Sequence, residues 1–287
     1  MISGALYNNG DARLRSGTLA LDYSSSSASK LSDTNILYIN GGTLDLRGGS
    51  GTETVASTTV AGGAQANIMR SSGSTVLALG ALSTGSGGAL NIAADNIATT
   101  TSANTNGIIG GSGRITIAGA DWAANDGSGN IVAYTGYTAY TDNSAGANTI
   151  NYLVTGNAGS TVNVSAQTLK ITTTGAGQSL NLGTRSLTLG NGSGQSAGLL
   201  FVGADDYTIT AGLIGASGGG NAQAIHNYGA GKLTLGAGLN HPTSFFGTGY
   251  TVLASNSTQN AGISVGGGTV EFSSNAQIGS PTGTTMR

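Results

Sequence analysis

The chain has no cysteine, only 2 prolines among its 287 residues, and few aromatic side chains. Without cysteine, disulfide bonds and thiolate chemistry are excluded, although the cellular compartment stays open. Charged residues make up 8% of the chain, against roughly 25% in an ordinary soluble domain. The 10 basic residues are dispersed and the net charge is -2. A nucleic-acid partner, which needs clustered Lys and Arg, is therefore not expected.

Long apolar runs are also missing. No stretch of about 18 apolar residues offers a transmembrane helix, so the sequence predicts no membrane insertion within this chain. Residues 1–17 lack the apolar centre of roughly 7–15 residues that a secretory signal peptide requires. We therefore expect either a chain that is soluble as it stands or a processed segment of a longer protein.

Glycine is abundant, with 51 residues, beside 38% hydrophobic residues and a mean hydropathy of +0.06. Disorder goes with low hydrophobicity and high net charge, and neither applies here. Gly, Asn and Ser crowd the segments between apolar pairs, where bends need a positive φ or local side-chain hydrogen bonds. The composition indicates a packed core built from short strands and small turns.

The segment "SLNLGTRSLTLGNG" shows a pattern that recurs along the chain. It holds two apolar-x-apolar pairs separated by four residues, and the same pattern occurs in "TVNVSAQTLKITTTG", "LLFVGADDYTIT", "ILYINGGTLDLRGG" and "GISVGGGTVEFSS". Alternation over three to five residues is typical of a strand with one buried face. The three central copies start at 162, 180 and 200, which predicts a coil of about 18–20 residues or slightly more.

A single coil buries too little apolar surface to offset the entropy of ordering its backbone, so coils must stack. We therefore predict an all-β fold, a right-handed parallel β-helix or β-solenoid, with an antiparallel β-sandwich as the alternative. The inward aliphatic side chains of successive coils form what we name the core column. Its predicted members are Val162, Val164, Leu169, Ile171, Leu180, Leu182, Leu187, Leu189, Leu200, Val202, Ile209, Leu233, Leu235, Ile263, Val265, Val270 and Phe272.

The segment "GAGKLTLGAGLN", followed by "GISVGGGTVEFSSNAQIGSP", resembles the autotransporter-associated β-strand repeat. The resemblance covers about residues 107–281, and residues 1–106 share it only through composition and "GGTLDL". It implies a right-handed β-helical passenger exported to the bacterial cell surface or the medium. We expect one continuous solenoid over 1–287, weakly repeat-like over 1–106 and family-like over 107–287, as a segment of a longer exported chain.

The polar residues do not indicate a catalytic or metal site. Asp205 and Asp206, the only adjacent pair of carboxylates, fall in a spacer and suit a solvated turn, whereas polysaccharide hydrolases need paired carboxylates across the substrate. "NDGSGN" is similar to the first half of a calcium loop, but Tyr137 stands where the bidentate Glu is expected. His226 and His241 lack the spacing of a transition-metal site. We predict no catalytic residue, metal or cofactor.

The aromatic residues offer one candidate contact surface. Tyr134, Tyr137 and Tyr140 in "VAYTGYTAYT" follow Trp122 by a dozen or more residues. Period-three spacing cannot place all three tyrosines on one strand face, so some rings should be exposed, where they can stack on sugars or contact another protein. We name these four residues as possible ligand or partner contacts; packing in the core or a turn is the alternative.

The sequence at neither end of the chain is typical of the polar cap that a solenoid normally needs. An uncapped stack exposes strand edges and an apolar cross-section. We therefore expect the partner to be another copy, end to end in a filament, or the flanking coils of a longer chain, with cell-surface glycans as further candidates. The predicted function is a non-catalytic extracellular structural protein acting in adhesion or as a fibre. The alternative is a carbohydrate-active enzyme or glycan-binding module on the same scaffold.

Overall fold

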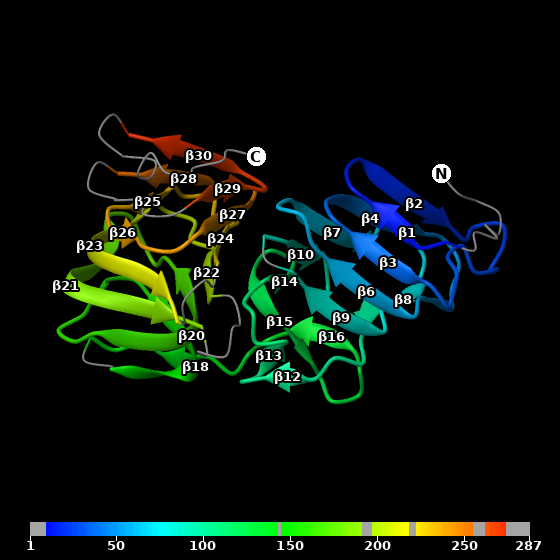
Figure 1. Cartoon of the computed structure of the whole chain (residues 1–287), viewed down its shortest axis with the longest axis horizontal. Coiled ribbons are helices and arrows are strands. Elements are labelled where there is room, and N and C mark those ends of the chain that lie inside the picture. Colours follow the sequence, from blue (N-terminus) through cyan, green and yellow to red (C-terminus); the bar gives the residue numbers. More distant parts are fainter. Residues whose placement is uncertain are drawn as a thin grey trace. The chain divides into compact units, whose positions relative to one another are not determined.

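A computed structural model describes residues 10–85, 87–142, 145–190, 197–217, 222–254 and 262–273. These residues form strands, turns and bends, and they contain no helix. Most strand pairs are parallel and join segments that lie one coil apart in the sequence, so the fold is an all-β solenoid of stacked parallel sheets (Figure 1). The antiparallel sandwich is therefore wrong for the chain as a whole. Over the same residues, no helix with the length and hydropathy of a membrane span occurs.

The chain divides into two compact units, one made of Met1–Gly110 and Arg114–Tyr134, the other of Gly111–Gly113 and Thr135–Arg287. Each unit has its own cluster of buried apolar side chains. Among the described strands, every ladder stays within one unit. The continuous solenoid over 1–287 stays a prediction, and the ladders and apolar clusters of the described residues fall into these two units.

The described strands of the first unit form four sheets. The first sheet contains β1 (Ala12–Leu14), β3 (Ile36–Ile39), β6 (Ser57–Val60) and β9 (Ala81–Thr84). The second contains β2 (Thr18–Asp22), β4 (Gly42–Arg47), β7 (Gln65–Arg70), β10 (Ala89–Ile92), β14 (Ile115–Ile117), β15 (Asp121–Asn125) and β16 (Ile131–Ala133). The third contains β5 (Thr52–Thr54), β8 (Val76–Ala78) and β11 (Ala98–Thr99), and the fourth pairs β12 (Asn104–Thr105) with β13 (Ile108–Ile109).

Stacking in the first unit is regular. Leu44, Ile68, Ile92 and Ile117 are paired in register from β4 to β14, and the sequence interval between partners is nearly constant. All four side chains are buried in the apolar cluster of this unit. In Figure 1, β3, β6 and β9 run in the same direction as consecutive arrows, as their parallel registers require. The described residues between 10 and 106, which are only weakly repeat-like in sequence, thus build a regular stack.

The parallel order of the first unit stops after β14. β15 pairs antiparallel with β14, and β16 pairs antiparallel with β15. Trp122 in β15 has no exposed surface. An antiparallel meander therefore occupies the edge that a further parallel coil would extend, which is one way of protecting the edge of a sheet.

The second unit is built on one 14-stranded sheet that winds around its core. Its strands are β17 (Thr138–Ala139), β18 (Gly146–Thr155), β19 (Ala158–Gly159), β20 (Val164–Thr172), β21 (Gln178–Leu189), β22 (Ala197–Phe201), β23 (Tyr207–Ala216), β24 (Gln223–Asn227), β25 (Leu233–Leu235), β26 (Gly238–Leu239), β27 (Thr243–Gly247), β28 (Tyr250–Leu253), β29 (Ile263–Val265) and β30 (Thr269–Phe272). The pairs among these described strands are parallel. We call each level of this stack a rung.

Rung length varies in the second unit. Leu169, Leu199, Ile225 and Phe245 are in register, and the sequence interval between partners shortens at each step. The predicted coil length therefore describes the last rungs, whereas the intervals from Leu169 to Leu199 and from Leu199 to Ile225 are longer and the interval from Tyr152 to Leu169 is shorter. The copies starting at 162, 180 and 200 are not successive levels of one column, because Val164 pairs with Leu187 whereas Leu180 pairs with Ile209.

Most predicted members of the core column are buried in the apolar cluster of the second unit: Val164, Leu169, Ile171, Leu180, Leu182, Leu187, Leu189, Ile209, Leu233, Leu235 and Ile263. Val270 and Phe272 are partly buried and pack against the same cluster. The prediction of Val162 as a member of the core column is wrong, because this residue precedes β20 and is only half-buried.

Leu200 and Val202 are also wrong as members of the core column. In β22 the neighbouring side chains, Leu199 and Phe201, lie in the apolar cluster. Successive side chains of a strand point to opposite faces, so Leu200 belongs to the other face, where it is nevertheless fully buried. Val202 follows the strand and is half-buried.

Candidate functional site

The four aromatic residues proposed as contacts do not form one cluster. Trp122 and Tyr134 belong to the first unit, whereas Tyr137 and Tyr140 belong to the second. Trp122 is fully buried, so its assignment as a surface contact is corrected: β15 places the indole in the interior. Tyr134 is half-buried, and its ring lies against Gly107.

The two tyrosines of the second unit are held by different contacts. The Nζ atom of Lys170 lies 5.1 Å from the centre of the Tyr137 ring. Tyr140 packs edge-on against Tyr152, with ring centres 5.7 Å apart, and its hydroxyl donates a hydrogen bond to the Gly159 carbonyl at 3.0 Å. Burial raises the pKa of the Tyr140 hydroxyl, and the negative charge of Asp142 acts in the same direction. Tyr140 thus fixes the backbone beside Asp142.

A pocket of about 180 Å³ lies next to this tyrosine, in the second unit. Its lining comes from the turn after β17, from β19 and the turn that follows it, and from the middle of β21: Asp142, Gly159, Ser160, Thr161, Asn181 and Gly183. Every side chain in this set is polar or absent. We call this hollow the Asp142 pocket. The sequence analysis missed it, because its polar residues lie in separate rungs.

Backbone contacts orient the polar groups of the Asp142 pocket. Oδ1 of Asp142 accepts the Gly159 N–H at 2.8 Å. Oδ1 of Asn181 accepts the Gly183 N–H at 2.9 Å, which closes the bend in β21 where Gly183 has φ +58°. The Ser160 hydroxyl donates to the Val162 carbonyl at 2.5 Å. One acidic group, one amide and two hydroxyls therefore surround a hollow left open by two glycines.

The last rung that the structure describes, β29 with β30, is a second feature of interest. Val265 is in register with Phe245 and so continues the core column. Phe245 is 2% exposed, whereas Val265 is 43% exposed. Phe272 is likewise in register with Leu253. Leu253 is fully buried, whereas Phe272 is half-buried. The prediction of Val265 as a buried core residue is wrong, because none of the residues that the structure describes continues the column beyond this rung.

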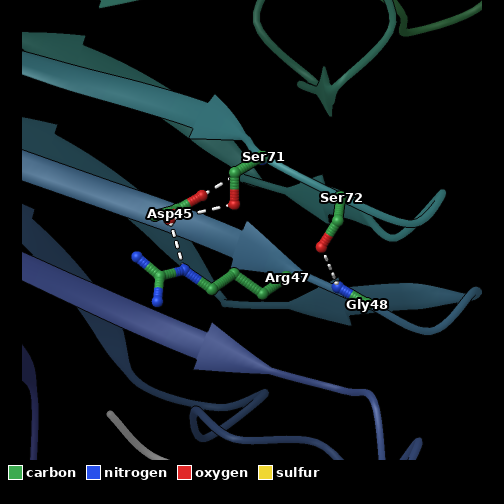
Figure 2. A network of polar contacts seen from close by, with 5 residues as sticks. All are labelled: Asp45, Arg47, Gly48, Ser71 and Ser72. Carbon is green, nitrogen blue, oxygen red and sulfur yellow. Dashed lines mark hydrogen bonds and ion pairs between the residues drawn. The ribbon is translucent and has the colours of Figure 1, made fainter.

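A buried carboxylate in the first unit has a structural role (Figure 2). Asp45 in β4 is 2% exposed. Its Oδ2 accepts from Nε of Arg47 at 2.6 Å and from the Ser71 hydroxyl at 3.1 Å, while Oδ1 accepts the Ser71 N–H at 3.1 Å. The Ser72 hydroxyl accepts the Gly48 N–H at 2.9 Å. These bonds join the end of β4 to the turn that follows β7, and the Asp-x-Arg spacing on β4 was the only signal in the sequence.

The acidic residues considered for catalysis or calcium serve turns. Asp206 binds the next coil through the backbone N–H of Lys232 at 2.8 Å and through Nζ of the same residue at 3.3 Å. Asp126 accepts from the backbone N–H groups of Ser128 at 2.8 Å and Asn130 at 3.1 Å. The Lys232 contacts lower the pKa of Asp206, and the pKa of Asp126 is lowered first by the Asn130 side-chain amide, which donates to Oδ2 at 2.8 Å, and then by the Ser128 N–H. Asp126 is thus used within its own turn, whereas Asp206 joins two successive coils.

The two histidines lie in different settings. His226 is fully buried in β24, with Nε2 3.1 Å from the Gly113 carbonyl and its ring 5.2 Å from that of Phe246. Nδ1 of His241 lies 2.6 Å from Oδ1 of Asn240. Within the part of the chain that the structure describes, no group of three His, Asp or Glu side chains is placed to hold a metal ion.

Comparisons with known proteins leave the family open. No family model, no curated protein and no solved structure matches this chain.

Proposed function

We propose that this chain is a non-catalytic structural protein of the cell surface or extracellular matrix, and that it associates end to end through the rung formed by β29 and β30. The observation that supports this is the break in burial along the core column, from 2% exposed at Phe245 to 43% exposed at Val265. Apolar side chains aligned with a buried column are stabilised when another rung covers them, by roughly 25 cal/mol per Å² of surface removed from water.

The proposed occupant is a strand-bearing rung of a second copy. Among the described strands, β29 pairs with β27 and β30 pairs with β28, and a strand of a second copy would extend these parallel ladders at a spacing of about 4.8 Å. Contact between unlike ends of a chain is heterologous, and when it does not close into a ring it produces an open filament. This mode of assembly suits a fibre or an adhesive surface layer. The resemblance to autotransporter-associated repeats supports the proposed location at the bacterial surface.

Sedimentation velocity and electron microscopy of the purified chain test the assembly. We expect oligomers or fibres that grow with protein concentration. Val265→Lys should weaken association by at least about tenfold, which corresponds to about 1.4 kcal/mol. The matched control is Leu213→Lys, because Leu213 is also an exposed aliphatic residue, 41% against 43%, but lies in β23 on an inner rung.

Two results would overturn the assembly proposal. One is a wild-type chain that stays monomeric at every concentration; the other is an equal loss of association in both lysine variants, which would indicate general surface stickiness. Melting curves establish that each variant is folded. Immunogold labelling of the producing cells tests the location, and label confined to the cytoplasm would contradict it.

A further inference from the structure

We propose that the Asp142 pocket binds a single neutral sugar ring of a glycan. This inference does not depend on end-to-end assembly: the pocket is lined by β19 and β21, whereas assembly uses β29 and β30. The strand path β21, β23, β25, β28 and β30 puts three strands between the two features. The two proposals can therefore fail separately.

The hydrogen-bonding groups of the pocket match a sugar hydroxyl pair. Because Oδ1 of Asp142 is engaged by the Gly159 N–H, Oδ2 is the oxygen available to a ligand. It lies 4.0 Å from the position of a Cβ built on Gly159, which is itself part of the lining. Oδ1 of Asn181 is engaged by Gly183, so its Nδ2 amide is the group this side chain can present. A carboxylate accepts and an amide donates, and a sugar hydroxyl does both.

The hydroxyl groups of the lining are held by contacts within the protein. Ser160 donates its proton to the Val162 carbonyl, and its side chain is also hydrogen-bonded to that of Tyr140. Thr161 lies next to it in the lining, where its N–H donates to the Asp142 carbonyl at 3.3 Å. A ligand with neighbouring hydroxyls can therefore pair with the Asp142 carboxylate and the Asn181 amide while these contacts keep the rest of the lining in place.

Charge and size narrow the class of ligand. Asp142 is the only charged residue of the lining, so an acidic sugar would be repelled. A calcium ion takes six to eight oxygen ligands, usually with several carboxylates, and one carboxylate is a poor match. The volume of about 180 Å³ lies below the roughly 300–1,000 Å³ of sites for drug-sized ligands. One neutral ring fits this description, with a dissociation constant in the millimolar range, as for weak sites worth about 4 kcal/mol.

Two substitutions test the pocket without removing its structural bonds. Asp142→Asn keeps an Oδ1 acceptor for the Gly159 N–H but replaces the ligand-facing oxygen with an amide donor. Gly159→Val fills the hollow: the nearest atoms to its Cβ lie 3.6 and 4.0 Å away, and Gly159 is not among the residues with a positive φ. The matched control is Gly175→Val, where nothing lies within 4 Å of the Cβ and φ is again not positive.

The measurement is saturation-transfer NMR on the full chain with methyl glycosides of glucose, galactose, mannose and N-acetylglucosamine, and with methyl glucuronide as the acidic comparison. We expect at least one neutral glycoside to bind the wild type and the Gly175→Val control with equal affinity. Asp142→Asn and Gly159→Val should each weaken binding by at least about tenfold, with melting temperatures that show folded protein.

Three outcomes would overturn the inference. The first is no transfer signal from any neutral glycoside at about ten times the expected dissociation constant. The second is binding that survives both pocket variants, which would place the site elsewhere. The third is a preference for the glucuronide, which the charge of Asp142 forbids. None of these measurements depends on whether the chain forms fibres.

Discussion

Glu53 is paired in register with Leu77, so a carboxylate occupies the inward position that an aliphatic side chain holds one coil later. Both side chains are fully buried. The carboxylate is accommodated by the segment that covers it. It accepts the hydroxyl protons of Tyr23 and of Ser29, the latter at 2.9 Å, and the N–H groups of Lys30 at 2.9 Å and Leu31 at 2.7 Å. Glu53 therefore anchors a serine-rich turn over the end of this column.

The first prediction concerns this anchor. Glu53→Gln keeps one acceptor oxygen but places an amide donor among four donors, so at least one buried donor loses its partner. We expect the free energy of unfolding of the first unit to fall by about 1–3 kcal/mol. Urea unfolding followed by circular dichroism measures it. Ser25→Ala, an exposed position in the same turn, is the control, and an equal effect in both variants would contradict the assigned role.

The second prediction concerns close approach between coils. Gly231 precedes β25, and a Cβ built there would overlap the carbonyl of Asp205 in the coil below. Its φ is not positive, so contact, and not backbone conformation, demands glycine. Gly231→Ala should destabilise the second unit by about 1–3 kcal/mol, as overpacking does. Gly175→Ala, with open space around its Cβ, should have little effect in the same urea titration. Equal stability of the two variants would refute the explanation.

Strand periodicity identified the inward face in segments where apolar and polar residues alternate inside a well-covered strand. In "KLTL", Leu233 and Leu235 are apolar and Lys232 and Thr234 are not, and both leucines are fully buried. In "LLFV" the residues on both faces of the strand are apolar, so alternation cannot tell whether Leu200 or its neighbours point inward. Leu199 points inward because it is in register with Leu169 and Ile225. This register depends on the lengths of the turns between strands, which a local sequence pattern does not contain.

Local sequence patterns likewise predicted neither the division into two units nor the Asp142 pocket. Rungs become shorter along one column of the second unit, so a period read from a few copies cannot assign each copy to a level. The pocket combines Asp142 with Asn181, residues that only stacking brings together. No feature of the sequence distinguishes the antiparallel strand β15 from a strand of a further parallel coil.

One device that links the rungs does have a sequence signal. Asp11, Asn157, Asn163 and Asp206 each directly precede a strand. Each accepts the backbone N–H of the residue that the parallel register aligns with it one coil later, at 2.8–3.1 Å. The side chain thus extends the parallel ladder by one bond. An Asp or Asn directly before an alternating segment indicates where a rung begins.

The third prediction tests this device at Asn157, whose Oδ1 accepts the Ser179 N–H at 2.9 Å. Asn157→Ala removes the acceptor and should lower the free energy of unfolding by about 0.5–1.5 kcal/mol, the usual net value of one hydrogen bond. Asn157→Asp retains the acceptor and should stay close to the wild type. Hydrogen exchange of the Ser179 amide reports the bond directly. Unchanged protection of that amide in the alanine variant would show that the side chain contributes nothing to the ladder.

The fourth prediction is the pH dependence of the same device at Asp206. The Lys232 N–H, first, and the Lys232 side chain, second, lower the pKa of this carboxyl below its ordinary value of 3.8. A lowered pKa means that the folded state favours the charged form. The stabilisation is therefore fully present above about pH 4 and is lost as the pH falls through the lower pKa of the folded state.

Asp206→Asn keeps an acceptor for the Lys232 N–H but cannot titrate, so it isolates this contribution. Because the side chain of Asp206 is 62% exposed, solvent screens its charge. We expect the wild type to be more stable than Asp206→Asn by about 1 kcal/mol or less at pH 7. The difference in melting temperature should be constant from about pH 7 to pH 5 and should shrink below about pH 4. A difference that disappears between pH 7 and pH 5 would assign the titration to another group, since a carboxyl with a lowered pKa stays charged throughout that range.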